Sequence, residues 1–172
     1  MKKMIIASLL ISIGSIVFIA CEKDDICAET EPTTPSMVVE FFNYEDQDIP
    51  RTETIQAYTA GREKDIISSS GNKLILPFRL DQQETSWILK RTIRIQEKTD
   101  TLRDTLTFKY RINTTFLNKA CGYVSTFSLY QDGTSPQLNG DPNRTAGNWI
   151  KQYITETNEI QNQDEVHFKI YY

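Results

Sequence analysis

The sequence predicts an all-β fold, a single antiparallel β-sandwich that is immunoglobulin-like in general shape. Apolar and polar residues alternate in several short runs after residue 36, which is the period of a strand with one buried face. About 150 residues bury enough apolar surface for one sandwich core, so we expect one domain over residues 37–172. Polar segments with turn residues separate the runs at 45–50, 68–73, 97–101 and 131–148.

The chain begins with a segment of signal-peptide type. Lys2 and Lys3 precede an apolar run that extends from residue 4 to Ala20. A positive start, an apolar centre and a small residue before the cut are the features of a signal peptide. A retained membrane anchor would need about 20 apolar residues without breaks, whereas serines and a glycine interrupt this run. We therefore expect residues 1–20 to be removed.

Cys21 follows this segment directly. The sequence Phe18-Ile19-Ala20-Cys21 resembles a bacterial lipobox, in which the cysteine is acylated and becomes the new N-terminus, although leucine is usual where Phe18 stands. Several acyl chains anchor a protein stably, whereas one chain binds only marginally. We therefore expect Cys21 to carry lipid and the rest of the chain to lie in water.

The four residues after this cysteine are charged. Glu22, Lys23, Asp24 and Asp25 resemble the short signal that sends lipoproteins of Bacteroidota to the outer face of the outer membrane, although a solvated tether has the same composition. Residues 21–36 contain prolines and no apolar period, so we expect a flexible tether. The expected location is the outer membrane, at the cell surface rather than the periplasmic face.

The net negative charge of the protein indicates which classes of partner it can bind. The formal net charge is −4, and removal of Lys2 and Lys3 with the leader makes it −6. An acidic surface without a basic patch disfavours nucleic acid as a partner. We expect the protein to contact the membrane through its N-terminal lipid and to bind an envelope protein or a glycan.

Four runs alternate clearly enough to assign an inward face. Pro77 lies on the opposite face of the first run and suggests an edge strand or a bulge. Arg91 interrupts the second run and suggests a bulge or the margin of the sandwich. The segment 148–160 fits a helix and a strand equally well. The predicted inward residues are Leu74, Leu76, Phe78 and Leu80; Trp87, Leu89, Ile93 and Ile95; Leu106, Phe108, Tyr110 and Ile112; and Val166, Phe168, Ile170 and Tyr172.

Two further cysteines remain, Cys27 and Cys121. An even number in an oxidising compartment favours a disulfide over two free thiols. Cys121 falls on the apolar face of its run, as either half of a bridge or a core thiol would. The other residues of that face are Tyr123, Ser125, Phe127 and Leu129.

The residues do not compose a catalytic motif. His167 is the single histidine and falls on the predicted outward face of the last strand, so no Ser-His or Cys-His pair and no zinc site can be assembled. We expect no enzyme activity, no cofactor and no metal. Two oxygen-rich turns have calcium-like ligand density but follow no calcium loop, and an ordinary polar turn explains both. Their residues are Glu45, Asp46 and Asp48, and Asn139, Asp141 and Asn143.

A short repeat, Asp-Thr-Leu, occurs twice in residues 100–106. Thr101 and Thr105 therefore resemble the acceptors of O-glycosylation on exported proteins of Bacteroidota. A strand entry in which Thr and Leu alternate would have the same sequence. The resemblance predicts a glycan on Thr101 or Thr105 in native material.

Four features together resemble a lipoprotein family of Flavobacteria and related bacteria, the domain-of-unknown-function family DUF6452. They are the lipobox at residues 18–21, Cys-Glu-Lys-Asp-Asp-Ile-Cys at residues 21–27, the all-β pattern, and Ala-Cys-Gly-Tyr at residues 120–123. The resemblance implies an envelope location and supports pairing of Cys27 with Cys121. It implies no activity.

The function we expect is that of a non-enzymatic, lipid-anchored module that binds a protein or glycan. One alternative is a structural accessory subunit of an outer-membrane assembly, docked by an exposed strand edge. The other is a glycoside hydrolase that uses carboxylates alone.

Overall fold

The computed structural model describes residues 26–172. The predicted signal peptide and the predicted lipid site Cys21 lie outside the described residues, as do the predicted export residues Glu22, Lys23, Asp24 and Asp25. The described chain forms two compact units. Residues 32–115 and 124–172 are here named the sandwich unit, and residues 26–31 and 116–123 the clasp unit.

Residues 26–172 form eleven strands and no helix, so this part of the chain holds no helix that could cross a membrane. The strands are β1 (Met37–Phe42), β2 (Ile55–Tyr58), β3 (Ile67–Ser68), β4 (Lys73–Leu76), β5 (Glu84–Ile95), β6 (Lys98–Asn118), β7 (Gly122–Leu129), β8 (Gln137–Leu138), β9 (Gln152–Thr155), β10 (Glu159–Ile160) and β11 (Phe168–Tyr171).

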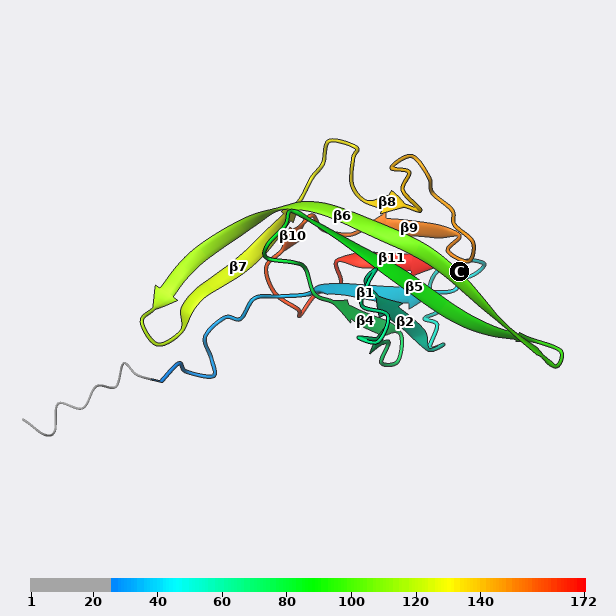
Figure 1. Cartoon of the computed structure of the whole chain (residues 1–172), viewed down its shortest axis with the longest axis horizontal. Helices are drawn as coiled ribbons and strands as arrows, with labels where there is room; N and C mark the ends of the chain where they lie inside the picture. The colour runs from blue at the N-terminus through cyan, green and yellow to red at the C-terminus, as the bar shows by residue number, and fades with distance from the viewer. Residues whose placement is uncertain (1–25) are drawn as a thin grey trace, which may run out of the picture. The chain divides into compact units, whose positions relative to one another are not determined.

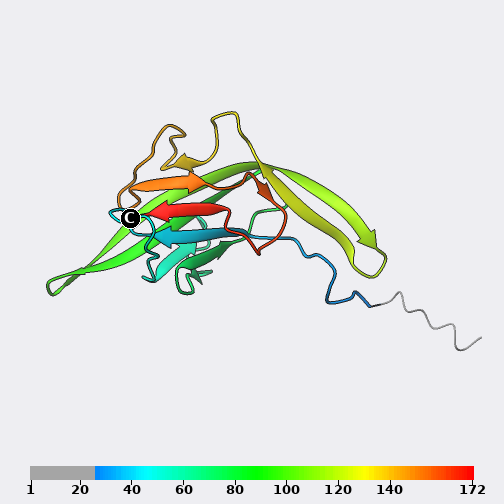
Figure 2. The ribbon, with the colours of Figure 1, turned by 180° about the vertical axis from the view of Figure 1, so that it is seen from behind.

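Two sheets pack together, which confirms the predicted β-sandwich (Figure 1). The four-stranded sheet has the order β4-β1-β11-β9, and the seven-stranded sheet has the order β10-β7-β6-β5-β2-β3 with β8 beside β6. The seven-stranded sheet is nearer the viewer in Figure 1 and the four-stranded sheet in Figure 2. The pair β1–β11 is parallel, with Val39 beside Phe168, which departs from the predicted antiparallel pairing. A parallel pair needs a long connection, and the rest of the sandwich provides it.

The core lies between the sheets and follows the strand period. Leu106, Phe108 and Tyr110 of β6 are fully buried, as their alternation predicts. The Phe78 ring stacks on Tyr110 with 4.4 Å between centroids and meets Phe127 edge to face at 5.1 Å. Such aromatic pairs contribute about 0.5–1.5 kcal/mol each beyond the area that they bury.

Several predicted inward residues lie outside the core. Leu80 is 57 % exposed because β4 ends at Leu76 and leaves it in a loop. Ile95 is 59 % exposed because β5 continues past its last partner on β2, which faces Arg91. Arg91 thus marks the margin of the sandwich, and the β5–β6 register passes through it without a bulge. Tyr123 is also exposed, whereas Ile93, Ile112 and Val166 are half-buried.

Two ambiguous segments are now assigned. The segment 148–160 is extended, with β9 and β10 and no helix, and Trp149 and Ile150 are buried just before β9. Pro77 directly follows β4, an edge strand of the four-stranded sheet, as the edge interpretation predicts.

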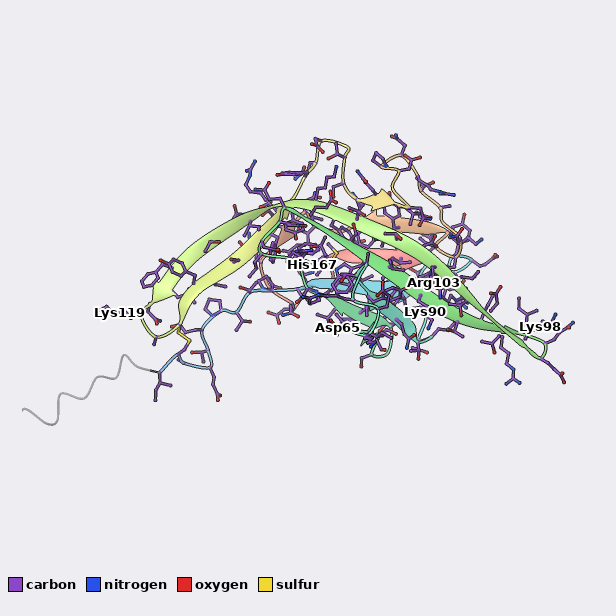
Figure 3. All side chains as sticks on the ribbon, in the orientation of Figure 1. Asp65, Lys90, Lys98, Arg103, Lys119 and His167 are labelled. Carbon is purple, nitrogen blue, oxygen red and sulfur yellow. A yellow bond between two sulfur atoms is a disulfide. The ribbon has the colours of Figure 1, made fainter. Side chains whose placement is uncertain are left out.

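His167 is buried, which corrects its predicted outward position (Figure 3). Its Nδ1 accepts a hydrogen bond from the Val38 backbone N at 2.9 Å, and its own backbone N donates to the Val38 carbonyl at 3.0 Å. The imidazole nitrogen therefore accepts the hydrogen bond from Val38 that a backbone carbonyl would otherwise accept, just before β11 begins to pair with β1. Tyr171, on the same predicted outward face, is also buried, and its ring stacks on Phe42 at 5.6 Å. Part of the outer face of the last strand is therefore buried, although Lys169 between these two residues is only half-buried, and alternation alone does not reveal this.

Candidate binding groove

A groove of about 760 Å³ opens on the sandwich unit, within the size range of small-ligand sites. It lies between residues 59–67, which connect β2 to β3, and residues 77–87, which lead from β4 into β5. It is here named the 59–87 groove. Its apolar side chains include Ile66, Ile67, Phe78 and Trp87, and its charged side chains are Arg62, Asp65, Arg79, Asp81 and Glu84.

Hydrogen bonds hold one wall of the groove against the core. The Tyr110 hydroxyl donates to the Arg79 carbonyl at 2.9 Å and lies 2.6 Å from Thr85 Oγ1. Thr85 Oγ1 in turn accepts from the Arg79 backbone N at 3.0 Å. Burial raises the pKa of Tyr110, so its hydroxyl keeps the proton that it donates. This wall is therefore fixed by the fold before any ligand arrives.

Trp87 lines the groove and is only 7 % exposed. Its Nε1 is buried and finds no acceptor within residues 26–172. A buried donor without a partner costs about 1–3 kcal/mol, which makes such a group rare in folded proteins. Because this nitrogen is covered, a ligand oxygen reaches it only when a neighbouring groove side chain shifts.

Charges of both signs surround the opening. Arg79 donates to both carboxylate oxygens of Asp81, at 3.0 and 2.6 Å, and this hydrogen bonding lowers the pKa of Asp81. Arg62 and Asp65 are exposed and form no ion pair within residues 26–172. Figure 3 labels Asp65, which lies in the loop between β2 and β3. Two charged side chains are thus free to meet a ligand.

The groove combines charged and apolar side chains, as small-ligand sites do. Carboxylates and guanidinium groups make directional hydrogen bonds to hydroxyl and amide groups, and apolar walls exclude water from them. A glycosidase needs one carboxylic acid whose pKa is raised so that it can protonate the leaving group. Arg79 shifts the pKa of Asp81 in the opposite direction.

A second cavity, of about 490 Å³, lies where β2 and β5 begin to separate. Its carboxylate, Glu53, accepts hydrogen bonds from Arg51 and from Arg91, the latter at 2.8 and 3.1 Å. Both guanidinium groups lie over the Tyr172 ring, at 4.4 and 4.6 Å. Burial acts to raise the pKa of Glu53, but the two arginines outweigh it and lower the pKa. Burial also raises the pKa of Tyr172 to about 12. The charged groups of this cluster bind one another, so the cluster is explained as a structural contact at the margin of the sandwich.

Two like charges face each other on the seven-stranded sheet. Lys90 of β5 pairs directly with Arg103 of β6 (Figure 3). Neither forms an ion pair within the described part of the chain. Directly opposed like charges destabilise a sheet. Charge composition did not predict this local basic pair on an acidic protein.

Asp104 is a buried carboxylate that sequence reasoning missed. It is 1 % exposed and accepts four hydrogen bonds from the 139–150 segment. The sequence does place it on the buried face of β6, because it stands two residues before the inward Leu106. The four donors are Asn139 Nδ2 (2.7 Å), Asn148 N (2.7 Å), Trp149 N (2.8 Å) and Ile150 N (3.0 Å).

The structure also places the other predicted site residues. Cys27 and Cys121 form a disulfide across 94 residues of sequence, within the clasp unit. Thr101 and Thr105 are half-buried on β6, and their glycosylation stays a prediction.

Side chains of the oxygen-rich turns accept hydrogen bonds from backbone N–H groups. Asn139 Oδ1 accepts from the Thr105 backbone N at 2.8 Å, and Asp141 Oδ1 accepts from the Asn143 backbone N at 2.9 Å. In the other turn, Asn43 Oδ1 accepts from the Glu45 backbone N at 2.9 Å. Among residues 26–172, no cluster of three His, Cys, Asp or Glu side chains could hold a metal ion.

The model of a family of unknown function, DUF6452, matches residues 53–172. The chain belongs to the DUF6452 family. The matched DUF6452 region contains both walls of the 59–87 groove and the buried Asp104. No curated protein and no solved structure matches the chain.

Proposed function

We propose that this DUF6452 protein is a lipid-anchored binding module of the outer membrane, exposed at the cell surface, and that the 59–87 groove holds its ligand. The observation that carries the proposal is the groove itself, which has one fixed wall and presents five charged side chains beside apolar ones. Support for the location comes from the signal-type segment before Cys21 and the charged residues after it.

The ligand chemistry that fits best is that of a glycan. Sugar hydroxyl groups are both donors and acceptors, so they can pair with carboxylates and with guanidinium groups along one surface. The groove presents Asp65 and Glu84 as acceptors and Arg62 as a donor. The apolar side chains of the groove can pack against the C–H faces of a sugar ring.

The experiment is a glycan array probed with the lipoprotein in detergent, followed by titration of any glycan that binds. Arg62→Ala and Asp65→Ala should each weaken binding about 10- to 100-fold, the equivalent of one charge-assisted hydrogen bond. Arg103→Ala and Asp100→Ala are matched controls outside the groove and should bind like the wild type.

Three results would overturn the proposal. One is a folded protein that binds no glycan on the array, and another is equal weakening by the groove and control variants. The third is hydrolysis of the bound glycan that stops in Asp81→Asn, which would make the protein a carboxylate-dependent glycosidase instead.

The second candidate function is that of an accessory subunit of an outer-membrane assembly. The pairing of β5 with β2 ends at Arg91, yet β5 continues to Ile95. Residues 92–95 therefore have an edge without a partner on that side, and such edges accept a strand from another protein. Cross-linking in intact membranes from residue 94 would capture that subunit, and a lack of protein adducts would contradict this function.

A further inference from the structure

The clasp unit concentrates exposed apolar side chains. Ile26, Phe116 and Tyr123 are 84, 53 and 71 % exposed, respectively. The Phe116 and Tyr123 rings meet edge to face with 5.2 Å between centroids, and Ile26 and Phe116 line one cavity of about 480 Å³. Single exposed apolar residues are normal, but a contiguous group marks a surface that contacts something.

Three polar side chains line the cavity beside this group, namely Glu31, Asn118 and Lys119. Lys119 is exposed at the β6–β7 turn and lines the same cavity as Phe116 (Figure 3). Aromatic rings with a nearby lysine are characteristic of membrane interfaces. The rings settle among the headgroups there, and the lysine stem lies along apolar surface while its ammonium stays in water.

The length of the chain limits how far this surface can be from a lipid anchor. Cys27 lies six residues after Cys21, and its disulfide to Cys121 holds the β6–β7 turn beside it. A chain of that length spans at most about 20 Å. The headgroup layer is about 5–8 Å thick, so a segment of at most about 20 Å keeps Cys27 near the membrane and lets the exposed group beside it reach the headgroups.

We propose that the clasp unit binds the surface of the membrane that holds the acylated Cys21, with Ile26, Phe116 and Tyr123 among the lipid headgroups. This inference rests on the lipid anchor of the proposed function. The Cys27–Cys121 disulfide then makes the β6–β7 turn a second membrane contact, in addition to the acyl chains.

The test uses the full lipoprotein with the photo-reactive residue p-benzoylphenylalanine in place of Phe116. The protein is purified and inserted into vesicles of phosphatidylethanolamine and phosphatidylglycerol, irradiated, and analysed by intact mass. The matched control carries the same residue in place of Ile154, an exposed apolar side chain of the sandwich unit. We expect lipid adducts at position 116, several-fold more than at position 154. Replacement of both Cys27 and Cys121 by serine should reduce the adducts at position 116.

The same mass spectra distinguish failure of the proposed membrane contact from failure of the proposed lipid anchor. A folded protein with lipid on Cys21 but no more lipid adducts at position 116 than at 154 overturns the inference and leaves the anchor intact. A protein without lipid on Cys21 overturns the anchor and the inference together. In native membranes, adducts at position 116 to a protein in place of lipid would also overturn it.

Discussion

Replacement of Asp104 by asparagine should destabilise the sandwich strongly. The carboxylate places two acceptor oxygens among four donors from the 139–150 segment and is 1 % exposed. An asparagine amide has the same shape but only one oxygen. Whichever way the amide is turned, its NH₂ group faces two donors, so two of the four hydrogen bonds are lost.

The magnitude follows from those two bonds. A hydrogen bond to a charged group contributes about 1.5–3 kcal/mol, so the loss of two should lower the free energy of unfolding by about 3–6 kcal/mol. A chain of this size loses about 2–4 °C of melting temperature per kcal/mol, which predicts a drop of about 6–24 °C. Urea unfolding and thermal unfolding measure the two quantities.

Gly147 supplies an independent check of the same contact. A Cβ at this position would collide with the Asp104 carboxylate, so Gly147→Ala should also destabilise the protein. In an Asp104→Ala background the carboxylate is gone, and Gly147→Ala should cost less there than in the wild type. Additive costs, or a free energy of unfolding in Asp104→Asn within about 1 kcal/mol of the wild type, would refute the role that we assign to Asp104.

Three further perturbations have expected outcomes. Replacement of Cys27 and Cys121 by serine removes a disulfide that joins residues 94 apart and so limits the conformations of the unfolded chain. In the chain-entropy model the free energy of unfolding should fall by about 4–5 kcal/mol, which urea unfolding measures. Lys90→Glu gives Arg103 an opposite charge across the strands and should raise that free energy by about 0.2–1 kcal/mol. Burial lowers the pKa of His167, so its neutral form is favoured in the native state. Stability should therefore be complete above the unfolded pKa of about 6.5 and fall as the pH drops toward the folded pKa, a dependence that His167→Gln should flatten.

Each of these three has a contrary outcome. An unchanged urea midpoint for the double cysteine variant under oxidising conditions would mean that the disulfide does not constrain the unfolded chain. A less stable Lys90→Glu variant would mean that Lys90 has a favourable role beside Arg103. Identical pH profiles for the wild type and His167→Gln would show that the imidazole does not titrate with unfolding.

The alternation of apolar residues was sufficient to predict the two-sheet sandwich and most of its core. Leu106, Phe108 and Tyr110 are buried as their period requires. The same period also contains Asp104, two residues before Leu106, but periodicity alone does not indicate that a charged residue is buried. Its burial depends on four donors from a segment about 40 residues away, and no local pattern records those partners.

The groove was beyond the reach of sequence reasoning for a related reason. Its walls come from residues 59–67 and 77–87, and neither segment has a recognisable motif. The two come together only through the pairing of β2 with β5. His167 was misplaced because the outer face of β11 was assumed to be solvated, whereas its Nδ1 accepts from Val38 on β1, 129 residues earlier.

Intact-mass measurement on the protein purified from its own membranes tests the proposed lipid anchor most directly. We expect a chain that begins at Cys21 and carries the additional mass of several acyl chains on that residue. A chain that still contains Met1, or one that begins at Cys21 without added lipid, would contradict it and would remove the basis for membrane binding by the clasp unit.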